Sequence, residues 1–120
     1  MAWYAAHAIM YFKLKSGVQD SFTIWENVYL IEAENSDEAL SKAKAWAKQE
    51  EGEDETLRVD GQPATQVFAG IRKLIEVSHW DEEGRLKHGD EITYSVLQVT
   101  DEQSIRELVK GEEVAITYIE

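Results

Sequence analysis

The residues of this sequence that could carry acid–base or metal chemistry are few and widely spaced. The histidines are His7, His79 and His88, and there is no cysteine. No two histidines have the short spacing that brings imidazoles onto one zinc ion. Without cysteine, neither a thiolate metal site nor a cysteine nucleophile can form. We therefore predict no catalytic residue set, no metal site and no cofactor, which disfavours an enzyme without excluding one.

Charged side chains inside otherwise apolar strands mark the candidate ligand or partner surface. Glu26 follows Trp25 in one expected strand, and Arg72 and Lys73 lie together in another. If these strands are neighbours, Glu26 and Arg72 form a partly buried ion pair. Such a pair is either structural or part of a surface that recognises an anion or a partner. His7, in the first strand, is expected to be a hydrogen-bonded histidine and not a base. Together with Trp25, Glu26, Arg72 and Lys73 it makes up the candidate surface.

Two acidic stretches could attract a cation. The polar loop over residues 78–90, which contains His79 and His88, also carries Asp81, Glu82, Glu83 and Asp90. A weak divalent-ion site there is the alternative to a solvated loop. The run from residue 50 to residue 55 lacks the alternating oxygen ligands of an EF-hand. We read that run as a solvated acidic turn.

Hydrophobic patterning predicts the strands. Residues 3–14 are apolar on both alternating sets, which indicates a strand covered on both sides, and residues 22–33 resume as a β-branched and aromatic strand. These two strands should form a hairpin. Further strands are expected over residues 65–77, 91–99 and 114–119, and Asp60-Gly61 is typical of a type I′ hairpin turn.

Two helices follow from capping signals. Asn35 with Glu38, and the stretch from Thr100 to Gln103 after the strand at 91–99, carry the capping-box signals of helix N-termini. In the first helix the apolar stripe leads us to expect Leu40 and Trp46 against the sheet. The second helix is short and should end at Gly111.

These elements predict an α+β fold in the order β-β-α-(β)-β-β-α-β. We expect one mainly antiparallel sheet of about five or six strands with two helices, in a single domain over residues 1–120. The order contains a split βαββαβ arrangement preceded by one additional strand. A ferredoxin-like topology is one way to connect it.

Composition limits the partners. The formal net charge is −12, so a phosphate backbone would be repelled and nucleic acid binding is not expected. The same field favours a basic protein partner, with a homo-oligomer as the other possibility. The start of the sequence lacks the features of a secretory signal, and no apolar run reaches membrane-spanning length. We expect a cytoplasmic protein that does not contact a membrane.

Several segments resemble a family of small bacterial proteins, the domain of unknown function numbered 4288. The likeness lies in residues 3–6, 25–33, 37–43, 67–71 and 89–95, and it is one of strand and helix patterns. It implies a bacterial cytosolic origin and carries over no catalytic residue. Residues 96–120 would then be a C-terminal extension of the family core.

Two functions remain open from the sequence. The first is a non-enzymatic protein-interaction or accessory module with an acidic surface. The second is a small ligand-binding domain or enzyme that uses Glu26, Arg72 and His7 in a cleft beside the sheet. A concave pocket holding all three residues would favour the second.

Overall fold

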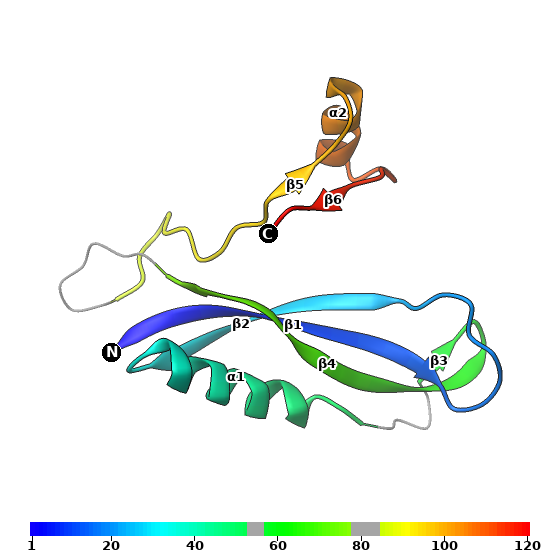
Figure 1. Ribbon diagram of the computed structural model, residues 1–120, viewed down its shortest axis with the longest axis horizontal. Coiled ribbons are helices and arrows are strands. Elements are labelled where there is room, and N and C mark those ends of the chain that lie inside the picture. The colour runs from blue at the N-terminus through cyan, green and yellow to red at the C-terminus, as the bar shows by residue number, and fades with distance from the viewer. Residues whose placement is uncertain (53–56, 78–84) are drawn as a thin grey trace.

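Figure 1 shows the computed structural model, which describes residues 1–52, 57–77 and 85–120. The elements follow one another as β1 (Ala2–Leu14), β2 (Ile24–Ala33), α1 (Ser36–Gln49), β3 (Arg58–Val59), β4 (Gln62–Glu76), β5 (Leu97–Gln98), α2 (Glu102–Lys110) and β6 (Thr117–Tyr118). The predicted α+β class and the predicted element order are both confirmed.

The strands are divided between two sheets. A four-stranded sheet has the order β2-β1-β4-β3, β5 and β6 form a separate two-stranded sheet, and all neighbours are antiparallel. The expected hairpin of the first two strands is present as β1 and β2. A ferredoxin-like topology is not formed, because the strands on either side of α2 pair with each other and not with the main sheet.

Local sequence signals account for most of the turns and helix ends. The side chain of Asn35 accepts a hydrogen bond from the Glu38 amide at 2.8 Å, and Asp101 caps α2 in the same way. Asp60 and Gly61 have φ of 51° and 79°, and both signs match the type I′ turn that joins β3 to β4. Gly111 ends α2 in the left-handed conformation.

The core lies between α1 and one face of the main sheet, which we call the helix face. Its buried residues are mostly alanines from both sides, together with Tyr4 and Ile31. Ala39 and Ala43 of α1 meet Ala6 and Ala33 of the sheet. Because these side chains are small, the helix sits close to the strands, and there is little room for a larger residue.

The expectation that Trp46 packs onto the sheet is wrong. Its side chain is 52% exposed, whereas Ala39, Ala43 and Ala47 are the buried residues of α1. Leu40 is partly buried. The cause is a rotation of the helix about its axis that favours close packing of alanines over burial of the largest side chain.

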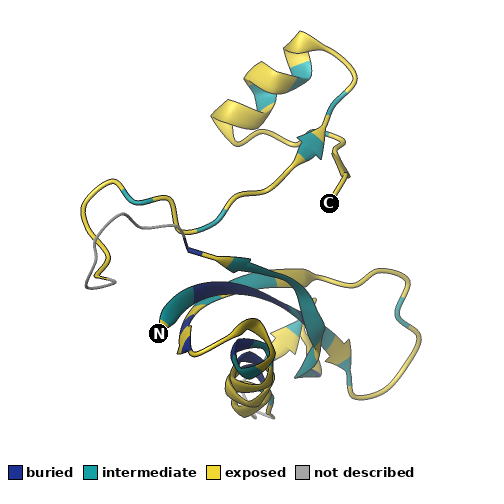
Figure 2. Cartoon of the chain, turned by 60° about the vertical axis from the view of Figure 1, so that its left-hand side comes forward, coloured by how far each residue is buried: buried dark blue, intermediate teal, exposed yellow. Residues whose placement is uncertain are grey.

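Beyond the main sheet lies a small C-terminal unit, which we define as residues 97–120. It consists of β5, α2 and β6, and Figures 1 and 2 show it apart from the main sheet with a mostly exposed surface. The strands expected over residues 91–99 and 114–119 are reduced to two residues each. In the part of the chain that the structure describes, no helix is long and apolar enough to span a lipid bilayer.

The alanine interface predicts the outcome of two substitutions in α1. Ala43→Leu should lower the free energy of unfolding by about 1–3 kcal/mol, because it overfills the contact between helix and sheet. Ala45→Leu, on the exposed side of the same helix, is the matched control and should change stability by less than about 0.5 kcal/mol. Urea denaturation of the purified variants measures both, and equal effects would contradict the packing described.

Candidate functional site

The candidate residues gather on the face of the main sheet opposite α1, which we call the open face. In the β1–β2 ladder Ile9 lies opposite Glu26, and in the β1–β4 ladder His7 lies opposite Lys73. Alternation of side chains along a strand puts His7 and Ile9 on the same face. Glu26 and Lys73 therefore flank the central strand β1 from its two neighbours.

A bulge in β4 brings both cations to the open face. His7 pairs with Lys73 and Ala8 pairs with Ile71, so that Arg72 has no opposite residue in β1. A bulged residue interrupts strict alternation. Arg72 and Lys73, which a regular strand would point to opposite faces, therefore lie side by side on one face.

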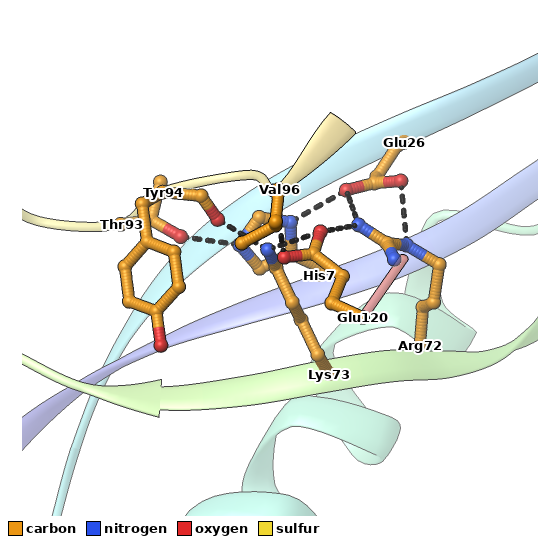
Figure 3. A network of polar contacts seen from close by, with 8 residues as sticks. All are labelled: His7, Glu26, Arg72, Lys73, Thr93, Tyr94, Val96 and Glu120. Atoms are coloured by element: carbon orange, nitrogen blue, oxygen red, sulfur yellow. Dashed lines mark hydrogen bonds and ion pairs between the residues drawn. The ribbon is translucent and has the colours of Figure 1, made fainter. Parts of the chain in front are cut away.

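His7 is the buried centre of the site and is only 2% exposed. Its Nδ1 lies 2.6 Å from Glu26 Oε2, and its Nε2 contacts Thr93 Oγ1 (Figure 3). Since a carboxylate only accepts hydrogen bonds, Nδ1 carries a proton and donates to Glu26. In the neutral ring Nε2 then accepts the hydrogen bond from the Thr93 hydroxyl. The expectation of a hydrogen-bonded histidine in the first strand is confirmed.

Arg72 makes a two-point ion pair with Glu26. Its Nε and Nη2 atoms lie 2.9 Å from Glu26 Oε1 and Oε2, respectively. The ion pair expected from the sequence is present, but β2 and β4 are not neighbours, because β1 lies between them. The long Arg72 side chain spans the distance. The two hydrogen bonds from Arg72, and the one from His7, lower the pKa of Glu26 below its ordinary value.

The side chain of Glu120 completes the charge balance. Its Oε1 accepts from Arg72 Nη2 at 2.9 Å and from Lys73 Nζ at 2.6 Å, and its Oε2 accepts from the Val96 amide at 2.9 Å. The hydrogen bond from Lys73 is the main cause that lowers the pKa of Glu120 to about 2. Two cations thus face two carboxylates, Glu26 and Glu120.

Two tyrosine rings lie against the cationic groups of Arg72 and Lys73. The guanidinium of Arg72 lies 4.4 Å from the centre of the Tyr118 ring, and Lys73 Nζ lies 5.1 Å from that of Tyr94. Lys73 also donates to the Tyr94 carbonyl. Cation–π contacts of this kind strengthen as water is excluded. We call His7, Glu26, Arg72, Lys73, Thr93 and Glu120 the polar cluster.

The polar cluster joins the C-terminal unit to the main sheet. His7, Glu26, Arg72 and Lys73 belong to the main sheet, whereas Glu120 belongs to the C-terminal unit and Thr93 to the segment that leads to it. Because the side chains of the cluster are mostly shielded from water, removal of one charge would leave its partner uncompensated. The arrangement is therefore well suited to fix the position of residues 93–120.

The chain of contacts from Thr93 through His7 to Glu26 has the connectivity of a hydroxyl, imidazole and carboxylate relay. A hydrolase would also need an oxyanion site and access for a substrate. Two apolar grooves open on the same face, but neither is lined by His7, Glu26 or Thr93. The relay is covered by the chain itself, which favours a structural role for it.

Other residues singled out from the sequence lie outside the polar cluster. Trp25 is on the helix face, where its ring meets Phe12 edge to face at 5.9 Å, so it is separate from the polar cluster. His79 and the acids at residues 81–83 lie outside the described residues, as do residues 53–55 of the acidic run over residues 50–55. Thr93, Tyr94, Tyr118 and Glu120 were not predicted from the sequence. Only the aromatic character of the two tyrosines could have hinted at cation contacts.

Comparison with known proteins gives one finding. The model of the family described as "Domain of unknown function (DUF4288)" matches residues 3–92. The chain belongs to this family. Neither the curated proteins nor the solved structures contain a significant match.

The boundary of the DUF4288 match divides the polar cluster. His7, Glu26, Arg72 and Lys73 lie inside the matched segment, whereas Thr93 and Glu120 follow it. The cations and the buried histidine are thus part of the family domain. The groups that close over them come from the chain after it.

Acid should weaken the attachment of the C-terminal unit. The pKa of Glu120 is about 2 in the folded protein against an ordinary value of 4.5, and that of Glu26 is also lowered. Carboxyls with lowered pKa contribute stability above their unfolded value and lose it as the pH falls through the folded value. Stability should therefore fall between about pH 4.5 and pH 2. Glu120→Gln should flatten this part of the profile, and an unchanged slope would contradict the assignment.

A double-mutant cycle measures the coupling of Glu26 to Arg72. The losses of unfolding free energy in Glu26→Gln and in Arg72→Met should together exceed the loss in the double variant. The difference, which is the coupling energy, should be about 1–3 kcal/mol. The reason is that each single change leaves a shielded charge unpaired. The exposed pair Glu38 and Lys42 on α1, 2.9 Å apart, is the control and should show about 0.3–0.5 kcal/mol. Additive effects at Glu26 and Arg72 would mean that they do not interact.

Proposed function

We propose that this DUF4288 protein is a non-enzymatic protein-interaction module whose C-terminal unit contacts the partner. The observation that carries the proposal is the exposed apolar stripe of α2. Ile105, Leu108 and Val109 fall at positions i, i+3 and i+4 of this helix, and Val109 is 83% exposed. None of the nine residues of α2 is buried.

An uncovered helix of this length gains little stability by itself. Helices shorter than about 12 residues are marginal in water, and a two-stranded sheet needs further packing to be stable. The C-terminal unit consists only of this helix and this two-stranded sheet. An amphipathic helix with an unburied apolar side is the usual form in which a helix enters a groove on another protein. Its apolar stripe therefore supports a role in recognition.

The main sheet provides the fixed base for this helix. The polar cluster holds Glu120 and Thr93 at the open face, so the C-terminal unit is attached through paired charges and hydrogen bonds. Interfaces gain affinity when the contacting element is held in place before binding. The same polar cluster thus serves the interaction role better than catalysis, because its charges are already paired within the chain.

The charge of the whole chain favours a basic partner. With a formal net charge of −12, the protein attracts positively charged surfaces and speeds their encounter. A second copy of the chain would meet the same charge and must gain more from apolar contact. We propose that the protein acts in the bacterial cytoplasm, a proposal that the family resemblance supports.

The test is affinity capture from a lysate of the source organism with matched variants. The wild-type protein should retain a partner, and Val109→Glu should lose it because a carboxylate then lies in the apolar stripe. Gln103→Glu is the control: it adds the same charge on the opposite side of α2, where the side-chain oxygen accepts from Arg106.

Size-exclusion chromatography with light scattering shows whether the retained partner is a second copy. Equal capture by wild type and Val109→Glu would contradict the role of α2. Circular dichroism of both variants checks that α2 and the sheets are kept.

A further inference from the structure

The carboxylate of Glu120 occupies a set of three converging donors. Arg72 and Lys73 both donate to its Oε1, and the Val96 amide donates to its Oε2. Both oxygens are thus bound, and the side chains of Arg72, Lys73 and Glu120 are each less than a quarter exposed. This is how binding sites for carboxylate ligands are built.

The two cations are held in place by groups other than Glu120. Glu26 accepts two hydrogen bonds from Arg72 and one from His7, which fixes the guanidinium from its far side. Tyr118 covers its plane. Lys73 is also bound to the Tyr94 carbonyl. Donors oriented in advance bind an anion without a further cost in side-chain entropy.

The charge of this set matches a monoanion. Arg72 and Lys73 supply two positive charges, and Glu26 removes one of them. One net positive charge therefore remains at the site. A carboxylate neutralises this charge, whereas a dianion would leave an excess negative charge. An additional anion beside Glu120 is likewise unfavourable, so an external ligand has to replace the Glu120 side chain.

A shallow, open apolar groove begins at Arg72. It has a volume of about 240 Å³ and is lined by Ile9, Ala69, Gly70, Ile71 and Arg72. A second groove of about 420 Å³ shares Ile9 and Ala69 with it and continues to Tyr11 and Ile24. Together they place apolar surface next to the cationic donors. A ligand with a carboxylate head and an apolar chain fits both features.

We infer that Arg72, Lys73 and the Val96 amide form a binding site for organic carboxylates that carry an apolar chain, with Glu120 as the internal occupant. The apolar chain lies in the groove from Ile9 to Ala69. Exchange of Glu120 for such a ligand removes one attachment of the C-terminal unit. This inference goes beyond the proposed interaction function and does not require a protein partner.

The test uses Glu120→Ala, which deletes a CH₂ and a carboxylate, a group the size of acetate. Thermal unfolding of this variant is measured with sodium acetate, butyrate or hexanoate and with sodium chloride at equal ionic strength. Acetate should raise its Tm in a saturable manner, on the order of 5 °C at about ten times the dissociation constant. Wild-type protein, whose site is filled, should respond to acetate no more than to chloride.

Chain length tests the groove. Each CH₂ that enters it should tighten binding by about fourfold, so hexanoate should bind Glu120→Ala more tightly than butyrate and acetate. Ala69→Gln in the Glu120→Ala background should abolish this dependence and leave acetate binding intact. If Glu120→Ala does not fold, Glu120→Ser, which also removes the carboxylate and leaves room for acetate, takes its place.

Two results would overturn the inference. An equal effect of acetate and chloride on the Glu120 variant would show that the donors are not a carboxylate site. Binding that is independent of chain length would remove the groove from the site and with it the ligand class. Capture of a protein through α2 is unaffected by either result, so the two proposals fail separately.

Discussion

The structure depends on how the guanidinium of Arg72 is neutralised. A cation that is mostly shielded from water destabilises the fold unless its nitrogens have anionic or other hydrogen-bond partners. Glu26 pairs with two of its nitrogens from β2, and Glu120 pairs with one of them from the C-terminal unit. The shared guanidinium therefore links three parts of the chain that make no backbone hydrogen bonds with one another.

The bulge in β4 is the backbone feature that makes this linkage possible. In an unbroken strand Arg72 and Lys73 would point to opposite faces, and one cation would enter the alanine core beneath α1. With Arg72 unpaired in the ladder, both cations face the open side. His7, buried in the central strand between them and Glu26, then orients Glu26 through Nδ1 and Thr93 through Nε2. Positive charge is thereby concentrated at one point of an acidic protein.

Helix caps and turns, which depend on residues close together in the sequence, could be predicted. Contacts between residues far apart in the sequence could not. Asn35, Asp60-Gly61 and Gly111 act through their own backbone neighbourhood, so their caps and turns followed from residue type. The prediction that Trp46 packs onto the sheet failed because the close approach of α1 to the sheet depends on alanines of β1 and β2. The alternation over residues 91–99 suggested a full strand, yet only Leu97–Gln98 finds a partner strand. Glu120 lies 48 positions from Arg72, and nothing in its own segment indicates that contact.

Amide hydrogen exchange in an Arg72→Met variant tests most directly whether the shared guanidinium holds the C-terminal unit. The amide of Ile119, which donates to the Val96 carbonyl at 3.1 Å, and the Val96 amide, which donates to Glu120 Oε2, report on whether the segment around Glu120 stays ordered. Both amides should exchange faster in the variant, whereas the ladder of β1 and β2 should keep its protection. Unchanged exchange at Val96 and Ile119 would contradict the account, because the C-terminal unit would then be held without Arg72.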